Sequence, residues 1–247
     1  MLLQNKTAVV TGCNRGIGKK ILEVFSANGA TIFACVRNIT EEFKTFLNEI
    51  KKKYNNQVIP IQFDLNDESQ IKKAASNILS SNSSIDILVN NAATIHTALF
   101  QMTSIKKLKE MFETDFFSQT LFTQYILKSM IKKKAGSILY IASSSALDGN
   151  EGRSAYSSAK AAMITQAKVL SREVGLYNIR VNTIAPGLTD TDMMRKNTPK
   201  EILNEVTSRI SLKRVANPEE IAKVALLLSS DLSSYITGQV IRVDGGM

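Results

Sequence analysis

The stretch Thr7-Ala8-Val9-Val10-Thr11-Gly12-Cys13-Asn14-Arg15-Gly16-Ile17-Gly18 runs from a short apolar segment through a glycine-rich turn into a helical pattern. Residues 7–10 predict a buried strand, and residues 17–28, which stop at Gly29, predict a helix. Glycine permits a tight turn and close backbone approach, and the helix that follows offers free N–H groups to an anion. The spacing G-x-x-x-G-x-G differs from the dinucleotide fingerprint G-x-G-x-x-G, but its physical basis is the same. We therefore expect this turn to hold a pyrophosphate.

Short apolar runs alternate with helical patterns along the rest of the chain. Further strands are expected over residues 31–36, 58–63, 86–89, 137–141, 179–184 and 239–243. Helices are expected over residues 40–54, 67–80, 105–133, through Tyr156, and after Asn217-Pro218, where Asn is the cap and Pro the first helical residue. Residues 190–215 are polar and irregular, with one helix at about 200–210. The alternation predicts an α/β fold, a doubly wound parallel sheet with helices on both faces.

Composition narrows the class of protein. The 247 residues contain no internal repeat or linker, so we expect a single domain over residues 1–247. No apolar run is long enough for a membrane span, and the N-terminus lacks the pattern of a signal peptide, which indicates a cytoplasmic protein without membrane contact. Cys13, Cys35 and His96 have no metal-ligand spacing, so no metal is expected. We expect both cysteines to be buried packing residues; His96 either touches a substrate or lies on the surface.

The net charge is +9, and its lysines gather in short groups at residues 51–53 and 132–134. Each group lies near the expected end of a helix, where cations complement the helix dipole. The alternative is a patch that binds a partner. The sequence carries no aromatic interleaving or nucleic-acid motif, so no nucleic-acid partner is expected.

The ends of the second and third strands bear on the choice of cofactor. An acidic residue after the second strand would bind the adenosine ribose 2′-hydroxyl of NAD, whereas an arginine accommodates the 2′-phosphate of NADP. Here the strand ends in Arg37, and Arg37 with Arg15 can form a clamp on a phosphate, which favours NADPH over NADH. The alternative is that one or both point to solvent. After the third strand, Asp64, followed by Leu65, can accept a hydrogen bond from the adenine amino group or cap the next helix.

Tyr156 and Lys160 are four residues apart in an Ala- and Ser-rich helical stretch, so their side chains share one face. A nearby ammonium would lower the tyrosine pKa, which would suit the phenol to proton transfer. Ser143 precedes Tyr156 by 13 residues, enough for a loop to bring the two hydroxyls together. Taken alone, the same spacing also fits an ordinary helix pair with the lysine in solvent.

In combination, these motifs resemble the short-chain dehydrogenase/reductase family. The resemblance rests on Thr11-Gly12 with Gly16-Ile17-Gly18, on Asn90-Asn91-Ala92-Ala93, Ser143, Tyr156 with Lys160, and Pro186-Gly187 before Thr189, and it extends to Val243-Asp244-Gly245-Gly246. Segments such as Tyr235-Ile236-Thr237-Gly238 are most similar to the bacterial 3-oxoacyl-(acyl-carrier-protein) reductases. The resemblance implies a Rossmann fold, an NAD(P) cofactor and a homotetramer.

The resemblance also implies roles for individual residues. Tyr156 would donate the proton to a carbonyl oxygen, Lys160 would lower its pKa and hold the nicotinamide ribose, and Ser143 would hydrogen-bond the substrate. The remaining cofactor-binding residues would be Gly12, Asn14, Arg15, Gly16, Ile17, Gly18, Arg37, Asp64, Leu65, Asn91, Ala92, Pro186, Gly187, Thr189 and Thr191. Residues 190–215 would form a lid over the substrate.

Two positions depart from the family pattern. Asp115 stands where members usually carry an Asn that supports a proton relay beside the lysine. A carboxylate would still pair with Lys160 and count among the catalytic residues, but its charge would raise the Tyr156 pKa. Ala93 replaces the commoner Gly, a change the family tolerates.

The function implied is NADPH-dependent reduction of a carbonyl to a secondary alcohol, with 3-oxoacyl thioesters as the substrate and acyl carrier protein as a candidate partner. The net charge suits an acidic partner, although Gly175-Leu176-Tyr177 stands where a basic residue is expected. One alternative is a dehydrogenase of a sugar, polyol or other biosynthetic alcohol. A more remote one is a cofactor-binding regulator without turnover.

Overall fold

The computed structural model describes residues 1–81 and 84–247 and is organised around a seven-stranded sheet in the order β3-β2-β1-β4-β5-β6-β7. All adjacent strands run parallel. The strands are β1 (Thr7–Thr11), β2 (Thr31–Val36), β3 (Val58–Gln62), β4 (Ile87–Asn90), β5 (Gly136–Ile141), β6 (Ile179–Pro186) and β7 (Val240–Val243). The strand order reverses between β1 and β4, so the predicted doubly wound α/β fold is confirmed.

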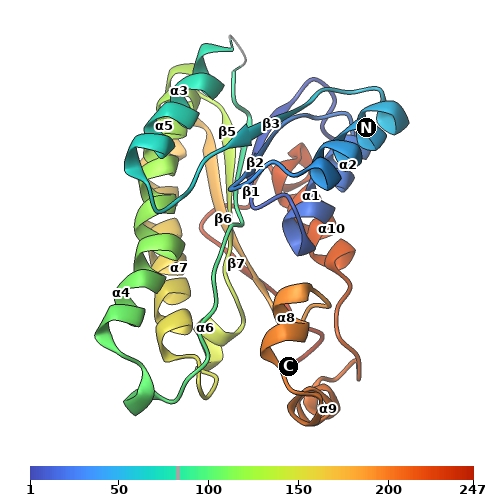
Figure 1. The fold of residues 1–247 in the computed structure, drawn as a ribbon. Helices are drawn as coiled ribbons and strands as arrows, with labels where there is room; N and C mark the ends of the chain where they lie inside the picture. Colours follow the sequence, from blue (N-terminus) through green and yellow to red (C-terminus); the bar gives the residue numbers. More distant parts are fainter. Residues whose placement is uncertain (82–83) are drawn as a thin grey trace.

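Helices cover both faces of this sheet, as Figure 1 shows. The main helices are α1 (Gly16–Ala27), α2 (Glu41–Tyr54), α3 (Glu68–Ser80), α4 (Ile105–Phe112), α5 (Ser118–Lys133), α6 (Ser145–Asp148), α7 (Ser154–Val174), α8 (Asp192–Asn197), α9 (Lys200–Arg209) and α10 (Pro218–Ser229). Short single turns occur at η1 (Phe100–Met102), η3 (Gly175–Tyr177) and η4 (Asp231–Ser233). Helices α1, α2 and α10 pack on one face, and α3, α5 and α7 on the other.

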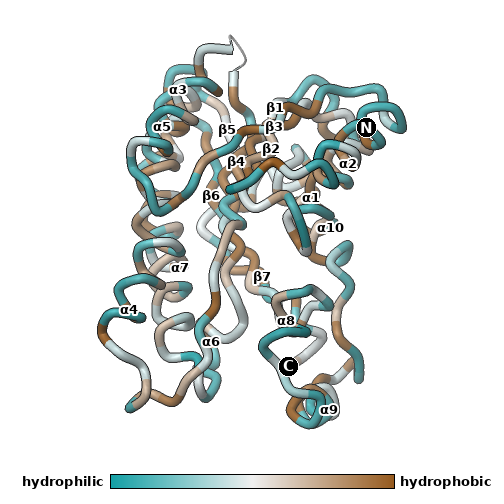
Figure 2. The backbone as a smooth tube through the Cα atoms, viewed as in Figure 1, coloured by the Kyte–Doolittle hydropathy of each residue, from teal (hydrophilic) through white to brown (hydrophobic). Residues whose placement is uncertain are grey.

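The hydrophobic core has two layers because successive strand residues point to opposite faces. In β1, Ala8 and Val10 join the layer beneath α1, α2 and α10, while Val9 joins the layer beneath α3, α5 and α7. This is why the strands are continuously apolar rather than alternating. Figure 2 shows the consequence: hydrophobic residues concentrate along the central strands, whereas hydrophilic and hydrophobic residues alternate along the helices.

The helix predicted over residues 105–133 is not continuous. Helix α4 ends at Phe112, a π-helical segment η2 (Glu113–Phe117) follows, and α5 begins at Ser118. A π-turn inserts a wider loop into the hydrogen-bond ladder and is common near functional sites. Here it places Asp115 in the interior, fully buried, while Phe117 is exposed.

Helix ends explain most of the lysine clusters. Helix α2 has Lys51, Lys52 and Lys53 in its last turn, and α5 ends at Lys133. Lys53 lies 3.9 Å from Glu23, and Lys133 pairs with Asp86. Both groups of lysines therefore lie at helix ends, as predicted. The predicted cap at Asn217 is confirmed, with Pro218 at the first position and a reciprocal capping box with Glu220.

Residues 190–215 contain two helices, not one. Besides α9, which was predicted, α8 forms directly after Thr191, whose hydroxyl accepts from the backbone N–H of Met194 at 3.2 Å. A helix of six residues carries no periodic signal, so the sequence did not indicate it. Within the described part of the chain, none of the helices combines the length and apolarity needed to cross a membrane.

Candidate active site

A cavity of about 940 Å³ opens along the carboxyl ends of strands β1 to β6. Its position at the reversal of strand order is the one at which doubly wound sheets bind ligands. Every predicted site residue except Asp115 lines it, namely Gly12, Asn14, Arg15, Gly16, Ile17, Gly18, Arg37, Asp64, Leu65, Asn91, Ala92, Ser143, Tyr156, Lys160, Pro186, Gly187, Thr189 and Thr191. Ala93 also lines the cavity.

The glycine turn after β1 has a conformation that only glycine allows without strain. Gly12 has φ +73°, and a Cβ there would lie 2.9 Å from the side-chain nitrogen of Asn91. A Cβ on Gly18 would overlap the carbonyl oxygen of Gly12. Asn91 fastens this arrangement, because its Nδ2 donates to the Thr11 carbonyl at 2.8 Å. The turn is thus a bare backbone cradle at the N-terminus of α1, which fits a pyrophosphate.

Two exposed arginines stand at this end of the cavity. Arg15 precedes α1, in the capping position, without a side-chain cap, and Arg37 follows β2. Asp64 does not cap helix α3; its carboxylate accepts from the Asn66 N–H, and Asp67 provides the cap through Ser69 and Gln70. The alternative capping role predicted for Asp64 is therefore wrong, since the cap needs a residue directly before the helix.

The predicted catalytic side chains meet where β5 ends and α7 begins. Tyr156 lies in the first turn of α7, and Lys160, one turn later, is fully buried. Lys160 does not extend into solvent, because its Nζ donates to the Ile141 carbonyl at 3.1 Å and lies 5.9 Å from the centre of the Tyr156 ring. Ser143 lies close to Tyr156, and its hydroxyl accepts from the Ser145 N–H at 3.2 Å. The three predicted groups therefore converge.

Asp115 lies behind this group, outside the cavity wall. One carboxylate oxygen accepts from the N–H of Thr94 at 2.8 Å and from its hydroxyl at 3.2 Å. The other lies 3.6 Å from Lys160 Nζ and has no hydrogen-bond partner among the described residues. The predicted pairing of Asp115 with Lys160 is confirmed as a fully buried ion pair.

Burial and this ion pair determine the proton affinities. Burial raises the pKa of Asp115 and lowers the pKa of Lys160, while each charge opposes the shift of the other. Burial, followed by the charge of Asp115, raises the pKa of Tyr156 to about 12. The expected effect of Asp115 is confirmed. The expectation that Lys160 lowers the Tyr156 pKa is wrong in this structure, because burial dominates and Lys160 is directed at Asp115 and Ile141. Tyr156 is therefore a protonated phenol at neutral pH.

The segment over the far end of the cavity is anchored at both of its ends. Thr189 forms a bridge with Ala216, the Asp190 N–H donates to the Ala216 carbonyl, and the Ala216 N–H donates to the Leu188 carbonyl. Between these anchors, α8 and α9 contribute apolar side chains to the cavity wall. With neighbouring loops they form an apolar lining of Ile95, Leu99, Leu188, Met193, Met194, Ile202, Val206 and Met247.

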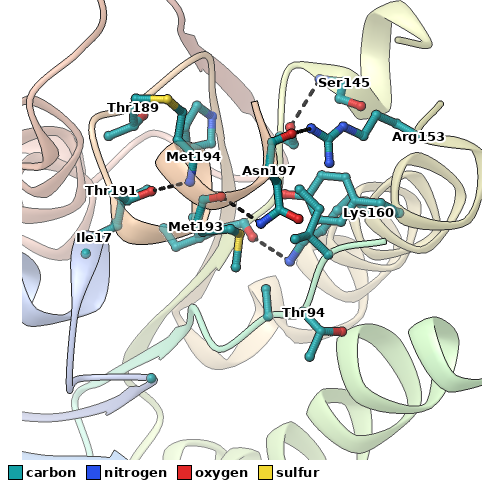
Figure 3. Close-up of a pocket in the computed structure, with 18 of the residues that line it drawn as sticks. Ile17, Thr94, Ser145, Arg153, Lys160, Thr189, Thr191, Met193, Met194 and Asn197 are labelled. Carbon is teal, nitrogen blue, oxygen red and sulfur yellow. Dashed lines mark hydrogen bonds between the residues drawn. The ribbon is translucent and has the colours of Figure 1, made fainter. Parts of the chain in front are cut away.

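Sequence reasoning named none of five charged residues of the cavity as a site residue: Glu151, Asp192, Glu205, Arg209 and, beside Tyr156, Arg153. Arg153 immediately precedes α7 and donates to the Thr97 hydroxyl at 2.5 Å and to the Asn197 carbonyl at 3.2 Å. Figure 3 shows it reaching toward Asn197 at the end of α8. The only available signal was its place three residues before Tyr156, on the same helix face.

The two cysteines and the histidine do not belong to the group of catalytic side chains. Cys13 and Cys35 are buried and free, as expected, and burial raises the pKa of both thiols. His96 is half-buried and does not line the cavity. Its neighbours Ile95 and Thr97 line the cavity, whereas His96 itself is partly exposed beside it.

Known proteins resemble this chain over its whole length. A family model described as enoyl-(acyl carrier protein) reductase matches residues 12–247. A 3-oxoacyl-(acyl-carrier-protein) reductase from Chlamydia trachomatis is 40% identical over 246 residues, covering 100% of this chain and 98% of that protein. The reductase of the same name from Aquifex aeolicus is 38% identical, covering 99% and 98%. The solved structure of a candidate NAD(P)-dependent gluconate 5-dehydrogenase from Beutenbergia cavernae, with NADP bound at low occupancy, has a TM-score of 0.92 at 31% identity, covering 99% and 97%.

Proposed function

Because the chain belongs to the short-chain dehydrogenase/reductase family and is an oxidoreductase, we propose that it reduces the ketone of a 3-oxoacyl thioester to a secondary alcohol with NADPH. The observation that carries this proposal is the convergence of Ser143, Tyr156 and buried Lys160 beside the glycine turn in one cavity. Full-length similarity to the two 3-oxoacyl-(acyl-carrier-protein) reductases supports the substrate.

In the proposed mechanism, two residues contact the carbonyl oxygen of the substrate, and two others lie behind them. Tyr156, protonated at neutral pH, donates its proton to the oxygen as negative charge develops there. Ser143 donates a hydrogen bond to the same oxygen and holds it in place. Lys160 lies behind Tyr156, with its Nζ 5.9 Å from the centre of the ring, and would hold the nicotinamide ribose. Asp115, paired with Lys160, positions the ammonium and moderates its charge.

The residues present fit a nicotinamide dinucleotide. The glycine cradle between β1 and α1 would hold the pyrophosphate, and Asp64 and Leu65 would border the adenine. Asn91, Ala92, Pro186, Gly187, Thr189 and Thr191 would border the nicotinamide half. When bound, this cofactor supplies the hydride. Arg15 and Arg37, both exposed at the cradle, would bind the 2′-phosphate, which is our reason for proposing NADPH over NADH.

The far part of the cavity suits an acyl chain. Its lining includes aliphatic side chains and methionines, whose flexible thioethers adapt to chains of different shape. We propose that residues 190–215 act as the substrate lid. We also propose a cytoplasmic homotetramer that meets acyl carrier protein through its basic surface, in keeping with the net charge of +9.

A second candidate is oxidation or reduction of a sugar acid or polyol. The likeness to the Beutenbergia cavernae structure, whose name includes gluconate 5-dehydrogenase, favours it. Since the fold serves many substrates, the choice rests on the cavity beyond Tyr156.

The test is the loss of NADPH or NADH absorbance with purified protein and a panel of acetoacetyl-CoA, gluconate-derived ketones and small ketones. We expect fast NADPH oxidation with the thioester. Turnover of only the sugar ketones would support the second candidate. Binding of NADPH without turnover of any carbonyl would favour the regulator without activity.

A further inference from the structure

Among the described basic residues of the substrate half of the cavity, Arg153 is the one that lacks an acidic partner. There, Arg209 pairs with Glu205 at 2.5 Å, and Asp192 lies 3.6 Å from Arg195. Among the described residues no carboxylate lies within ion-pair distance of Arg153. Arg153 is nevertheless half-buried. A half-buried guanidinium gains most from an acceptor that is polar or anionic.

The two partners of Arg153 come from segments that border the cavity. Thr97 lies in the loop after β4, and Asn197 is the last residue of α8. The contact with the Asn197 carbonyl, at 3.2 Å, is longer than usual for a strong charged hydrogen bond, so another oxygen can replace it. Arginine carries more N–H donors than the two used here, so further donors are available to a ligand.

The base of Arg153 is held in place. The Ser157 N–H donates to its carbonyl at 2.7 Å as α7 begins, and the Ala98 N–H donates to the Gly152 carbonyl at 3.0 Å. These bonds hold the backbone of Arg153 at the start of α7, three residues before Tyr156. The charge of Arg153 is near enough to lower the pKa of Tyr156 slightly against the effect of burial.

A purely structural role is possible for an arginine with carbonyl partners, and Arg180 provides the comparison. Arg180 is also half-buried and donates to the carbonyls of Leu228, Ser230 and Ile236, which join β6 to the end of α10. It does not line the cavity. Arg153 lines the cavity, and its partners border the space beyond Tyr156.

We propose that Arg153 is a specificity-determining residue, whose guanidinium binds a second substrate oxygen, on the carbon β to the ketone carbon that is reduced. This inference rests on the proposed carbonyl reduction. A thioester carbonyl and a carboxylate offer the same acceptor chemistry at that position. The Asn197 carbonyl occupies the place of this oxygen in the structure described here. A simple ketone lacks the second oxygen and leaves the guanidinium without its ligand.

The test compares matched substrates at saturating NADPH. The first pair is the acetoacetyl thioester of N-acetylcysteamine and the thioether in which a methylene replaces the thioester carbonyl. The second pair is acetoacetate and butanone. Each is measured with the wild type, Arg153→Gln, Arg153→Lys and the control Arg172→Gln, an exposed residue near the end of the same helix.

In at least one pair, we expect Arg153→Gln to lower kcat/KM for the substrate with the second oxygen about 10- to 100-fold relative to kcat/KM for the ketone without it. The thioether and butanone should change little, Arg153→Lys should retain part of the ratio, and Arg172→Gln should behave as the wild type. A loss in the first pair identifies the thioester carbonyl as the ligand, and a loss in the second identifies a carboxylate.

Equal losses for all four substrates, or unchanged ratios in both Arg153 variants, would show that Arg153 only holds the lid. The wild-type rates test the proposed function separately. If the wild type reduces acetoacetate but not the thioester, the 3-oxoacyl proposal is wrong, while the second pair still decides the role of Arg153. Thermal unfolding of Arg153→Gln checks that the variant is folded.

Discussion

The two halves of the cavity are lined by different parts of the polypeptide, one mainly by backbone and the other mainly by side chains. The half beside β1 and β2 is formed by main chain: glycines without room for a Cβ, a helix N-terminus, and two exposed arginines at the edge. The half around Tyr156 is formed by side chains, including a buried ion pair and an arginine with neutral partners. Backbone geometry depends on local spacing, whereas a buried charge depends on residues brought together from distant segments. Substitutions in the first half should therefore lower the free energy of unfolding, whereas substitutions in the second half should lower the rate of catalysis.

The sharpest way to separate the halves is to remove the proposed acid. Tyr156→Phe should lower kcat about 10²- to 10⁴-fold while leaving the affinity for NADPH nearly unchanged, because it removes one proton donor and little packing. Steady-state kinetics and a fluorescence titration of NADPH measure the two effects. Tyr235→Phe, at a fully exposed tyrosine, is the control. Retention of the wild-type rate would refute the assignment of Tyr156.

One added methyl group in the cofactor half should lower the stability of the protein. Gly18→Ala should lower the free energy of unfolding by about 2 kcal/mol or more, because the new Cβ would overlap the Gly12 carbonyl. Gly175→Ala is the matched control, since its Cβ would meet nothing within 4 Å and its φ is −58°. Urea unfolding measures both. Equal stability of the two variants would contradict the close fit of the turn.

Arg37, at the edge of the cofactor half, should determine the preference for NADPH over NADH. Arg37→Ala should raise the KM for NADPH about 10-fold, the modest value suited to an exposed guanidinium, and leave the KM for NADH unchanged. NADH serves as the internal control. Parallel changes for both cofactors would mean that Arg37 does not contact the 2′-phosphate.

The smallest expected effect tests the buried pair. Asp115→Asn removes a negative charge that raises the Tyr156 pKa, so that pKa should fall. Reduction needs protonated Tyr156 and slows as pH rises through its pKa. The alkaline fall in kcat/KM should therefore begin at lower pH in the variant. Glu113→Gln, an exposed neighbour in the same π-helical segment, should keep the wild-type profile. An unshifted profile in Asp115→Asn would show that its charge does not reach Tyr156.

Sequence alone was sufficient for the sheet and for a set of site residues of which all but Asp115 line one cavity. The strands are short, buried and continuously apolar, and the motifs fall at their ends, so parallel packing brings Gly12, Asn91, Ser143 and Pro186 to one edge. The spacing of Tyr156 and Lys160 likewise fixed a shared helix face.

Three features could not be predicted because they depend on tertiary environment. The π-turn that buries Asp115 leaves no mark in a pattern of helical period. The direction of the Tyr156 pKa shift follows from burial, which a spacing of residues does not measure. The contacts of Arg153 join segments 56 and 44 residues away in the chain.

The paired backbone hydrogen bonds around Thr189 and Ala216 have a consequence for evolution and engineering. They hold the entrance and exit of residues 190–215 side by side, next to the carboxyl end of β6. A segment whose ends already meet can change in length or content at little entropic cost to the rest of the chain. Residues 190–215 can therefore be exchanged as a unit. Replacing them with the equivalent segment of a relative should change the choice of substrate while the sheet and the glycine turn stay intact.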